Sequence, residues 1–252
     1  MSLESIRIWL SPSGPNPWKV VVIMEELSIP YKIVSLKFDD VKKKPYTDIN
    51  PNGRFPAIHD PNTGLTLWES GAILNYLIEQ YDTRNLISYA TLKEKHHCNQ
   101  WLHFQVSGQG PYYGQAGWFN VMHPEKVPSA IERYNDQARR VLGVLDGWLS
   151  DRKWLVGDKI TYADIVFAPW NERFDAVVAC APEEKFDGFP HVAAWHQRII
   201  ERPSWKAAME HRDNGMDEQG LMWNGRPKGI KTFQEYEAKI AKGEDTTPAK
   251  DL

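Results

Sequence analysis

The feature of this sequence that most constrains its fold is a change of hydrophobic periodicity near residue 86. Before this point, short apolar runs typical of strands alternate with segments in which apolar residues recur at helical spacing. After it, apolar residues recur at helical spacing in long segments that are separated by short Pro or Gly breaks. The chain is therefore predicted to be an α+β protein with two domains. The first covers residues 1–85, and an all-helical bundle follows over residues 86–215.

The first domain is predicted to contain a β-α-β unit followed by a β-β-α unit. Its strands are expected over residues 6–10, 31–38, 55–58 and 65–68. Asn16 is expected to cap its first helix, which stops before Pro30, and Ser70 is expected to cap its second helix, which ends near Tyr81. The Phe55-Pro56 bond is a candidate for the cis isomer, because proline inside a strand needs a special position.

The second domain is predicted to consist of helices over residues 89–107, 128–150, 161–179, 191–201 and 204–213. Thr161 and Asp164 have the spacing of a capping box, which marks where a helix begins. Residues 216–252 form a polar tail, for which the sequence predicts one short helix near residues 232–243 and a partly disordered end.

Charge and cysteine content exclude several classes of function. The 252 residues carry a formal net charge of -3 without a basic stripe, so neither nucleic acid nor an anionic membrane is an expected partner. No segment approaches membrane-spanning length, and the N-terminus lacks the pattern of a signal peptide. Cys98 and Cys180 lie far apart and form no Cys-x-x-Cys motif. A reducing, cytoplasmic location is therefore expected.

The loop over residues 11–20 connects the first strand to the first helix. Asn16 is a good N-cap residue, and proline suits the position after it. A helix N-terminus presents free N–H groups and a positive dipole end, so this junction favours a bound phosphate, carboxylate or thiolate. The alternative interpretation is that Asn16 only caps its helix.

Three segments together resemble the soluble glutathione transferases: residues 55–58 (FPAI), 68–77 (WESGAILNYL) and 154–164 (WLVGDKITYAD). Residues 15–20 (PNPWKV), 50–54 (NPNGR) and 101–105 (WLHFQ) are similar to the branch that contains the fungal nitrogen-regulator (Ure-type) and bacterial Nu-type transferases. The resemblance implies a thioredoxin-like domain that binds glutathione, a helical domain that binds a small apolar electrophile or disulfide, and a homodimer. It implies glutathione as co-substrate and no metal.

The resemblance also assigns roles in the first domain. The side-chain amide of Asn16 would stabilise the glutathione thiolate by donating a hydrogen bond to it. The hydroxyls of Ser11 and Ser13 are alternative donors. The loop contains no cysteine, so glutathione must bring its own sulfur.

The rest of the tripeptide has complementary groups farther along the chain. Glu69 can pair with the γ-glutamyl ammonium, and Ser70 with its helix start can hold the γ-glutamyl carboxylate. The backbone of Phe55 would pair with the cysteinyl unit, as in strand addition. Arg54 and Lys42 would meet the glycine carboxylate, although a solvated role for Lys42 within its charged run is an equal alternative.

Aromatic residues of the second domain are candidates for the pocket of the second substrate, although core packing is the alternative for each of them. The candidates are Phe104, Tyr112, Tyr113, Trp118, Phe119 and Trp170. The Tyr112-Tyr113 pair is favoured, because the glycines around it suggest an open helix end. The spacing of His96, His97 and His103 does not suit a metal chelate.

The leading hypothesis is a glutathione transferase whose thiolate attacks electrophiles or reduces small disulfides or peroxides, with a role in detoxification. In the disulfide reaction a second glutathione would resolve the mixed disulfide. The alternative is a glutathione-binding regulatory or ligand-carrier protein with little turnover.

Overall fold

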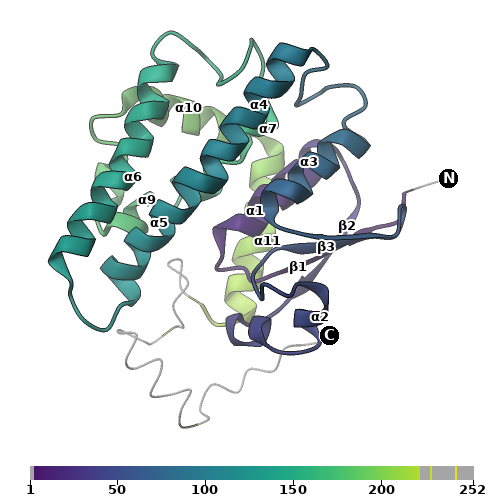
Figure 1. Ribbon diagram of the computed structural model, residues 1–252, viewed down its shortest axis with the longest axis horizontal. Coiled ribbons are helices and arrows are strands. Elements are labelled where there is room, and N and C mark those ends of the chain that lie inside the picture. Colours follow the sequence, from purple (N-terminus) through teal and green to yellow (C-terminus); the bar gives the residue numbers. More distant parts are fainter. Residues whose placement is uncertain (1–2, 222–227, 229–241, 243–252) are drawn as a thin grey trace. The chain divides into compact units, whose positions relative to one another are not determined.

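The computed structural model describes residues 3–221, 228 and 242, which divide into two compact units (Figure 1). The first unit contains residues 3–88 and 203–221, and the second contains residues 89–202. The helix over Pro203–Glu218 is thus grouped with the first unit, whereas the sequence predicts it in the second. Apart from Lys242, the tail helix predicted near residues 232–243 lies outside the described residues.

The first unit is built on a four-stranded mixed sheet, as expected for the thioredoxin-like part of the predicted fold. Its strands are β1 (Ile6–Leu10), β2 (Tyr31–Ser35), β3 (Ala57–Asp60) and β4 (Leu65–Trp68). The spatial order is β2-β1-β3-β4, with β1 parallel to β2 and the other pairs antiparallel. The predicted succession along the chain, β-α-β followed by β-β-α, is confirmed.

The chain between β2 and β3 differs from its prediction. β2 ends at Ser35 instead of residue 38, and a 3₁₀ turn η1 (Phe38–Lys42) and a short helix α2 (Tyr46–Ile49) follow. Both belong to the core of the unit, because Val41 and Tyr46 pack with Trp9 from the sheet. The Phe55-Pro56 bond is cis, as predicted, and so is Lys44-Pro45.

Helices α1 (Pro15–Glu26) and α3 (Ser70–Tyr81) complete the unit together with α11 (Pro203–Glu218), which packs along α1 (Figure 1). In α1, all residues from 17 to 24 are buried. A helix that is apolar on all sides requires cover on all sides. Both α3 and α11 contact α1 and supply part of this cover.

The second unit is helical. Its helices are α4 (Leu92–Phe104), α5 (Gly110–Gly117), α6 (Pro128–Leu149), α7 (Tyr162–Ile165), α8 (Ala168–Asn171), α9 (Phe174–Val178) and α10 (Pro190–Ile200). π-helical turns η2 (Gln105–Gln109) and η3 (Trp118–Met122) flank α5, and a 3₁₀ turn η4 (Pro182–Glu184) precedes α10. The single helix predicted over residues 161–179 is wrong. Three short helices stand there, and Pro169, which lacks an N–H, lies in the first turn of the second.

Asp164 joins three parts of the second unit. Its side chain accepts hydrogen bonds from the backbone N–H groups of Leu155 and Thr161, both at 2.8 Å, and from Trp195 Nε1 at 3.0 Å. The capping box of Thr161 and Asp164 is confirmed. Burial raises the pKa of the Asp164 carboxyl to about 6 despite these donors.

Candidate functional site

The loop between β1 and α1 is a tight turn held by its own hydrogen bonds. Gly14 N donates to Ser11 O at 3.2 Å, and the indole of Trp18 donates to Pro12 O at 2.9 Å. The hydroxyls of Ser11 and Ser13 are 3.2 Å apart, and Ser11 is buried. The start of α1 is therefore presented by a well-braced loop.

The prediction that Asn16 caps α1 is wrong. The helix begins at Pro15, its N-cap residue is Gly14 with extended backbone angles, and Asn16 is the second helical residue. Proline at the first helical position replaces an N–H that would have no partner within the helix, which explains the earlier start. Asn16 thus stays at the helix N-terminus, where the dipole favours an anion, although it is not the cap.

A similar shift of one residue occurs at α3. Ser70 is predicted as the cap, but it is the first residue of α3, and Glu69 is the N-cap with φ at 71°. The Glu69 carbonyl accepts the first helical hydrogen bond, from Ile73 N at 3.0 Å. A positive φ is uncommon for a residue with a side chain, and such conformations concentrate at binding sites.

Side-chain hydrogen bonds from Tyr46 and Asn50 hold the backbone of the loop over residues 50–55 in place. Tyr46 Oη and Asn50 Nδ2 donate to the same carbonyl, Arg54 O, at 2.7 and 2.6 Å. Asn50 Oδ1 accepts from Asn52 N at 2.9 Å. The ring of Phe55 packs on the ring of Tyr46, with centroids 5.1 Å apart.

Asn52 links two of the predicted glutathione-binding residues. Its side-chain amide donates to Glu69 Oε1 at 3.3 Å, and its carbonyl accepts from Lys42 Nζ at 3.2 Å. The structure thus brings Lys42, Arg54 and Glu69 to one loop and its direct neighbours. Asn52 lies in a run of turn-forming residues, Asn50 to Gly53, which predicts a turn and not these bridging contacts.

The burial of Lys19 is another feature that was not predicted from the sequence. Lys19 lies in α1, just after Trp18, and is only 1% exposed. Burial lowers the pKa of its ammonium from 10.5 to about 7, and the negative charge of Glu69 opposes part of this shift. The sequence feature that could have indicated this burial is the position of Lys19 as an isolated lysine directly before the apolar run of residues 20–24.

The aromatic candidates of the second unit lie in different environments. Tyr113 is fully buried between the rings of Trp170 and Phe174, at centroid distances of 6.1 and 5.3 Å. Tyr112 is half-buried below the guanidinium of Arg140. The expectation of an open helix end is therefore corrected, since residues 110–117 form a continuous helix and Tyr113 packs inside the unit.

The other aromatic candidates are partly accessible. Phe104, Phe119 and Trp170 are half-buried, and Trp118 is 41% exposed. Phe119 stacks on Tyr134 with an interplanar angle of 9°. These side chains could contact an apolar ligand, and each of them also packs against a neighbouring ring.

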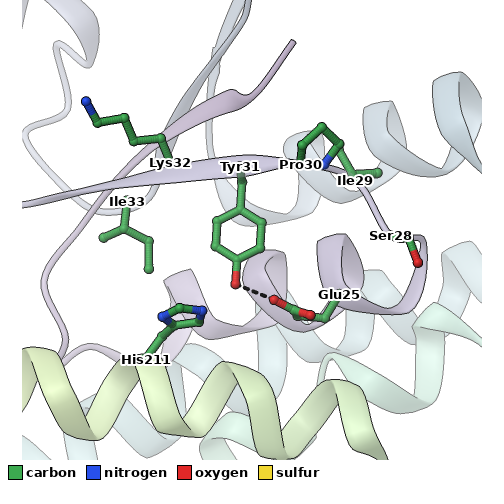
Figure 2. A pocket seen from close by; sticks show the side chains of 8 residues that line it. All are labelled: Glu25, Ser28, Ile29, Pro30, Tyr31, Lys32, Ile33 and His211. Carbon is green, nitrogen blue, oxygen red and sulfur yellow. Dashed lines mark hydrogen bonds between the residues drawn. The ribbon is translucent and has the colours of Figure 1, made fainter. Parts of the chain in front are cut away.

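A hollow of about 580 Å³ lies elsewhere on the first unit, lined by the turn after α1, the start of β2 and His211 of α11 (Figure 2). The hydroxyl of Tyr31 points toward Glu25 and donates a hydrogen bond to it, while His211 packs edge-on against the Tyr31 ring. Burial and this bond raise the pKa of Tyr31. The hollow contains none of the predicted site residues.

The described residues contain neither a metal-binding group nor a membrane-spanning helix. Within them, no three His, Cys, Asp or Glu side chains come together in a group that could hold a metal ion. No helix in this part of the chain is long and apolar enough to cross a membrane.

Family models match both units of the chain. Residues 4–79 match the glutathione S-transferase N-terminal domain, and residues 111–203 match the corresponding C-terminal domain. The glutathione S-transferase-like protein gedE of Aspergillus terreus is 46% identical over 216 residues, which cover 82% of this chain and 95% of gedE. The chain belongs to the glutathione S-transferase family.

Within this family, the similar proteins are of the Ure2 type. The transcriptional regulator URE2 of Saccharomyces cerevisiae is 33% identical over 240 residues, covering 80% of this chain and 67% of URE2. The glutathione transferase URE2P6 of Phanerochaete chrysosporium, solved with oxidized glutathione, has a TM-score of 0.80 and 43% identity, with 84% and 98% coverage. Ure2p5 of the same fungus, cocrystallized with 1-(S-glutathionyl)-2,4-dinitrobenzene, has a TM-score of 0.76 and 36% identity, with 86% and 98% coverage.

Proposed function

We propose that this glutathione S-transferase family member is an enzyme that uses the thiolate of glutathione to attack small apolar electrophiles. The observation that carries the proposal is the cluster around the loop of residues 50–55. One short segment brings together a carboxylate at Glu69, cations at Lys42 and Arg54, and a braced backbone at Phe55. These groups are complementary to the ammonium, the carboxylates and the cysteinyl backbone of glutathione.

Asn16 is assigned the stabilisation of the thiolate. A free thiol with a pKa near 8.5 is mostly protonated at neutral pH, so a site that attacks with sulfur must favour the anion. The N-terminus of α1 provides a positive dipole end, and the amide of Asn16 at the second helical position adds a donor. Ser13 and Ser11 are alternative donors, of which Ser11 is buried. The same thiolate would reduce a small disulfide, with a second glutathione resolving the mixed disulfide. With a peroxide it would form a sulfenic acid and release an alcohol or water, and a second glutathione would condense with the sulfenic acid to give oxidized glutathione and water.

The second substrate is assigned to the helical unit. Phe104, Trp118 and Trp170 offer partly accessible aromatic surface, which suits an apolar electrophile. A homodimer, which follows the family resemblance, and a cytoplasmic location, which is expected from the cysteine pattern, complete the proposal.

The test is glutathione-dependent turnover of a dinitrobenzene halide and of a small mixed disulfide by the wild type and Asn16→Ala. We expect turnover by the wild type and a loss of about 100- to 1,000-fold in kcat for Asn16→Ala, as for the removal of an anion-stabilising donor. Equal rates for both proteins would refute the role of Asn16. Light scattering that shows a monomer would refute the dimer.

The second candidate function is a glutathione-binding regulator or ligand carrier with little turnover. The similarity to a protein described as a transcriptional regulator favours it. Tight binding of glutathione without turnover of either substrate would support this candidate and contradict the enzyme.

A further inference from the structure

Two buried side chains of the first unit converge on one backbone carbonyl. Tyr46 in α2 and Asn50 directly after it are each 1% exposed, and both donate to the carbonyl oxygen of Arg54. Neither residue carries a charge, and neither takes part in the chemistry proposed above. A carbonyl oxygen has two lone pairs, and here buried side chains of one short segment supply two donors to the same oxygen, which requires an explanation.

The explanation lies in the geometry of the peptide group. The C=O of Arg54 and the N–H of Phe55 belong to the same planar unit, in which the two bonds point in opposite directions. When two buried donors hold the carbonyl toward the interior, the N–H of Phe55 is turned the other way. The orientation of the backbone at Phe55 is thus set from inside the unit.

We propose that Tyr46 and Asn50 are positioning residues that hold the Arg54-Phe55 peptide group in the orientation in which it pairs with the cysteinyl backbone of glutathione. This inference rests on the proposed function, in which Phe55 supplies that pairing. Binding gains when the partner is already held in its bound conformation, because less ordering remains to be done.

Further contacts brace the same peptide group. The ring of Tyr46 packs on the ring of Phe55, so one residue contacts the peptide group and the side chain that follows it. Asn50 closes the turn before it, since its carbonyl accepts from Gly53 N and its side chain accepts from Asn52 N, both at 2.9 Å. Asn52 in turn donates to Glu69, so Asn50 acts on two parts of the tripeptide site.

The principal variant is Tyr46→Phe, which removes one donor and keeps the ring that packs on Phe55. Asn50→Ala removes the second donor and the acceptor of Asn52. The matched control is Tyr76→Phe, which also removes a tyrosine hydroxyl from a hydrogen bond in the first unit. That hydroxyl donates to Asp60 Oδ2 at 2.5 Å and does not contact the loop of residues 50–55.

Glutathione binding to the 252-residue proteins is measured by calorimetry, and KM and kcat are measured with a dinitrobenzene halide at temperatures below the onset of unfolding. For Tyr46→Phe we expect Kd and KM for glutathione to rise about two- to tenfold, the equivalent of one hydrogen bond, with kcat within about twofold. Asn50→Ala should weaken binding at least as much. Tyr76→Phe should leave Kd and KM at the wild-type values.

An unchanged Kd in Tyr46→Phe and Asn50→Ala, with the wild type binding glutathione, would overturn the positioning role and leave the proposed function intact. So would an equal rise in Kd for Tyr76→Phe, since the effect would then be a general loss of stability. A wild type that binds no glutathione would instead overturn the proposed function, and the positioning role with it.

Discussion

Replacing Lys19 by Met tests the energetic consequence of burying a lysine in α1. The ammonium is taken from water into a site where burial lowers its pKa from 10.5 to about 7. A pKa difference of this size corresponds to about 5 kcal/mol. At low pH, where the ammonium is charged in both the folded and the unfolded chain, its burial lowers the free energy of unfolding by this amount. Methionine has a similar length and no charge, so it removes this cost without leaving a large cavity.

The pH dependence has a definite sign. Between pH 7 and 10.5 the unfolded chain binds more protons at Lys19 than the folded chain does, so the contribution of Lys19 to stability rises with pH through this window. For the wild type, linkage predicts a gain of about 2 kcal/mol from this residue between pH 7 and pH 9. Lys19→Met is expected to be more stable than the wild type at pH 7, because it removes the cost of burying the charge. It lacks the gain with pH, so the difference in unfolding free energy between the two proteins should shrink by about 2 kcal/mol from pH 7 to pH 9.

The assay is urea-induced unfolding of the ligand-free proteins at pH 7 and pH 9, followed by tryptophan fluorescence. Other groups titrate in both proteins, and their effects cancel in the difference between the two. The control is Lys32→Met, which removes an exposed lysine from β2, so a pH-dependent difference that appears only for Lys19→Met is assigned to the burial of Lys19. A difference between wild type and Lys19→Met that is the same at pH 7 and pH 9 would refute the reasoning.

Three further outcomes are expected. Asp164→Ala should lower the unfolding free energy by about 3 kcal/mol or more in urea titrations, because several buried donors lose their acceptor, and a loss below about 1 kcal/mol would contradict this. Gly53→Ala should lower the thermal midpoint and raise KM for glutathione, because φ is +57° and an added Cβ would lie 2.8 Å from Val41 O; unchanged values of both would count against the close packing of this loop. Cys98 is buried and its thiol pKa is raised to about 11, so mass spectrometry should find it unmodified by iodoacetamide in the folded protein and modified in urea, and rapid labelling of the folded protein would be inconsistent with its burial.

Much of the fold follows from local patterns. β1 and β4 have their predicted bounds, since short apolar or alternating runs between turn residues are typical of strands. The capping box at Thr161 and the cis bond before Pro56 were predicted for the same reason, because the residues that produce them are close in the chain. The segment of residues 161–179 shows the limit, because helical spacing continues through Pro169 although the backbone does not.

The candidate site was predictable in its residue types and less so in its geometry. Glu69, Arg54 and Lys42 stand out in the sequence because glutathione has complementary charges. Their connection through Asn52 depends on how η1, the loop of residues 50–55 and the start of α3 meet in space. Residues far apart in the chain make these contacts, so no spacing rule predicts them.

The sequence by itself determined that this protein has a strand-and-helix domain followed by helices, and its family resemblance predicts which charged residues would serve a tripeptide. Only the tertiary structure decided that α11 packs on α1, that Gly14 and Glu69 are the helix caps, and that Lys19 is buried. The physical reason is the range of the interactions. Periodicity and turn chemistry act between neighbouring residues, whereas burial, cap geometry and the choice of a packing partner depend on segments that meet only in the folded chain.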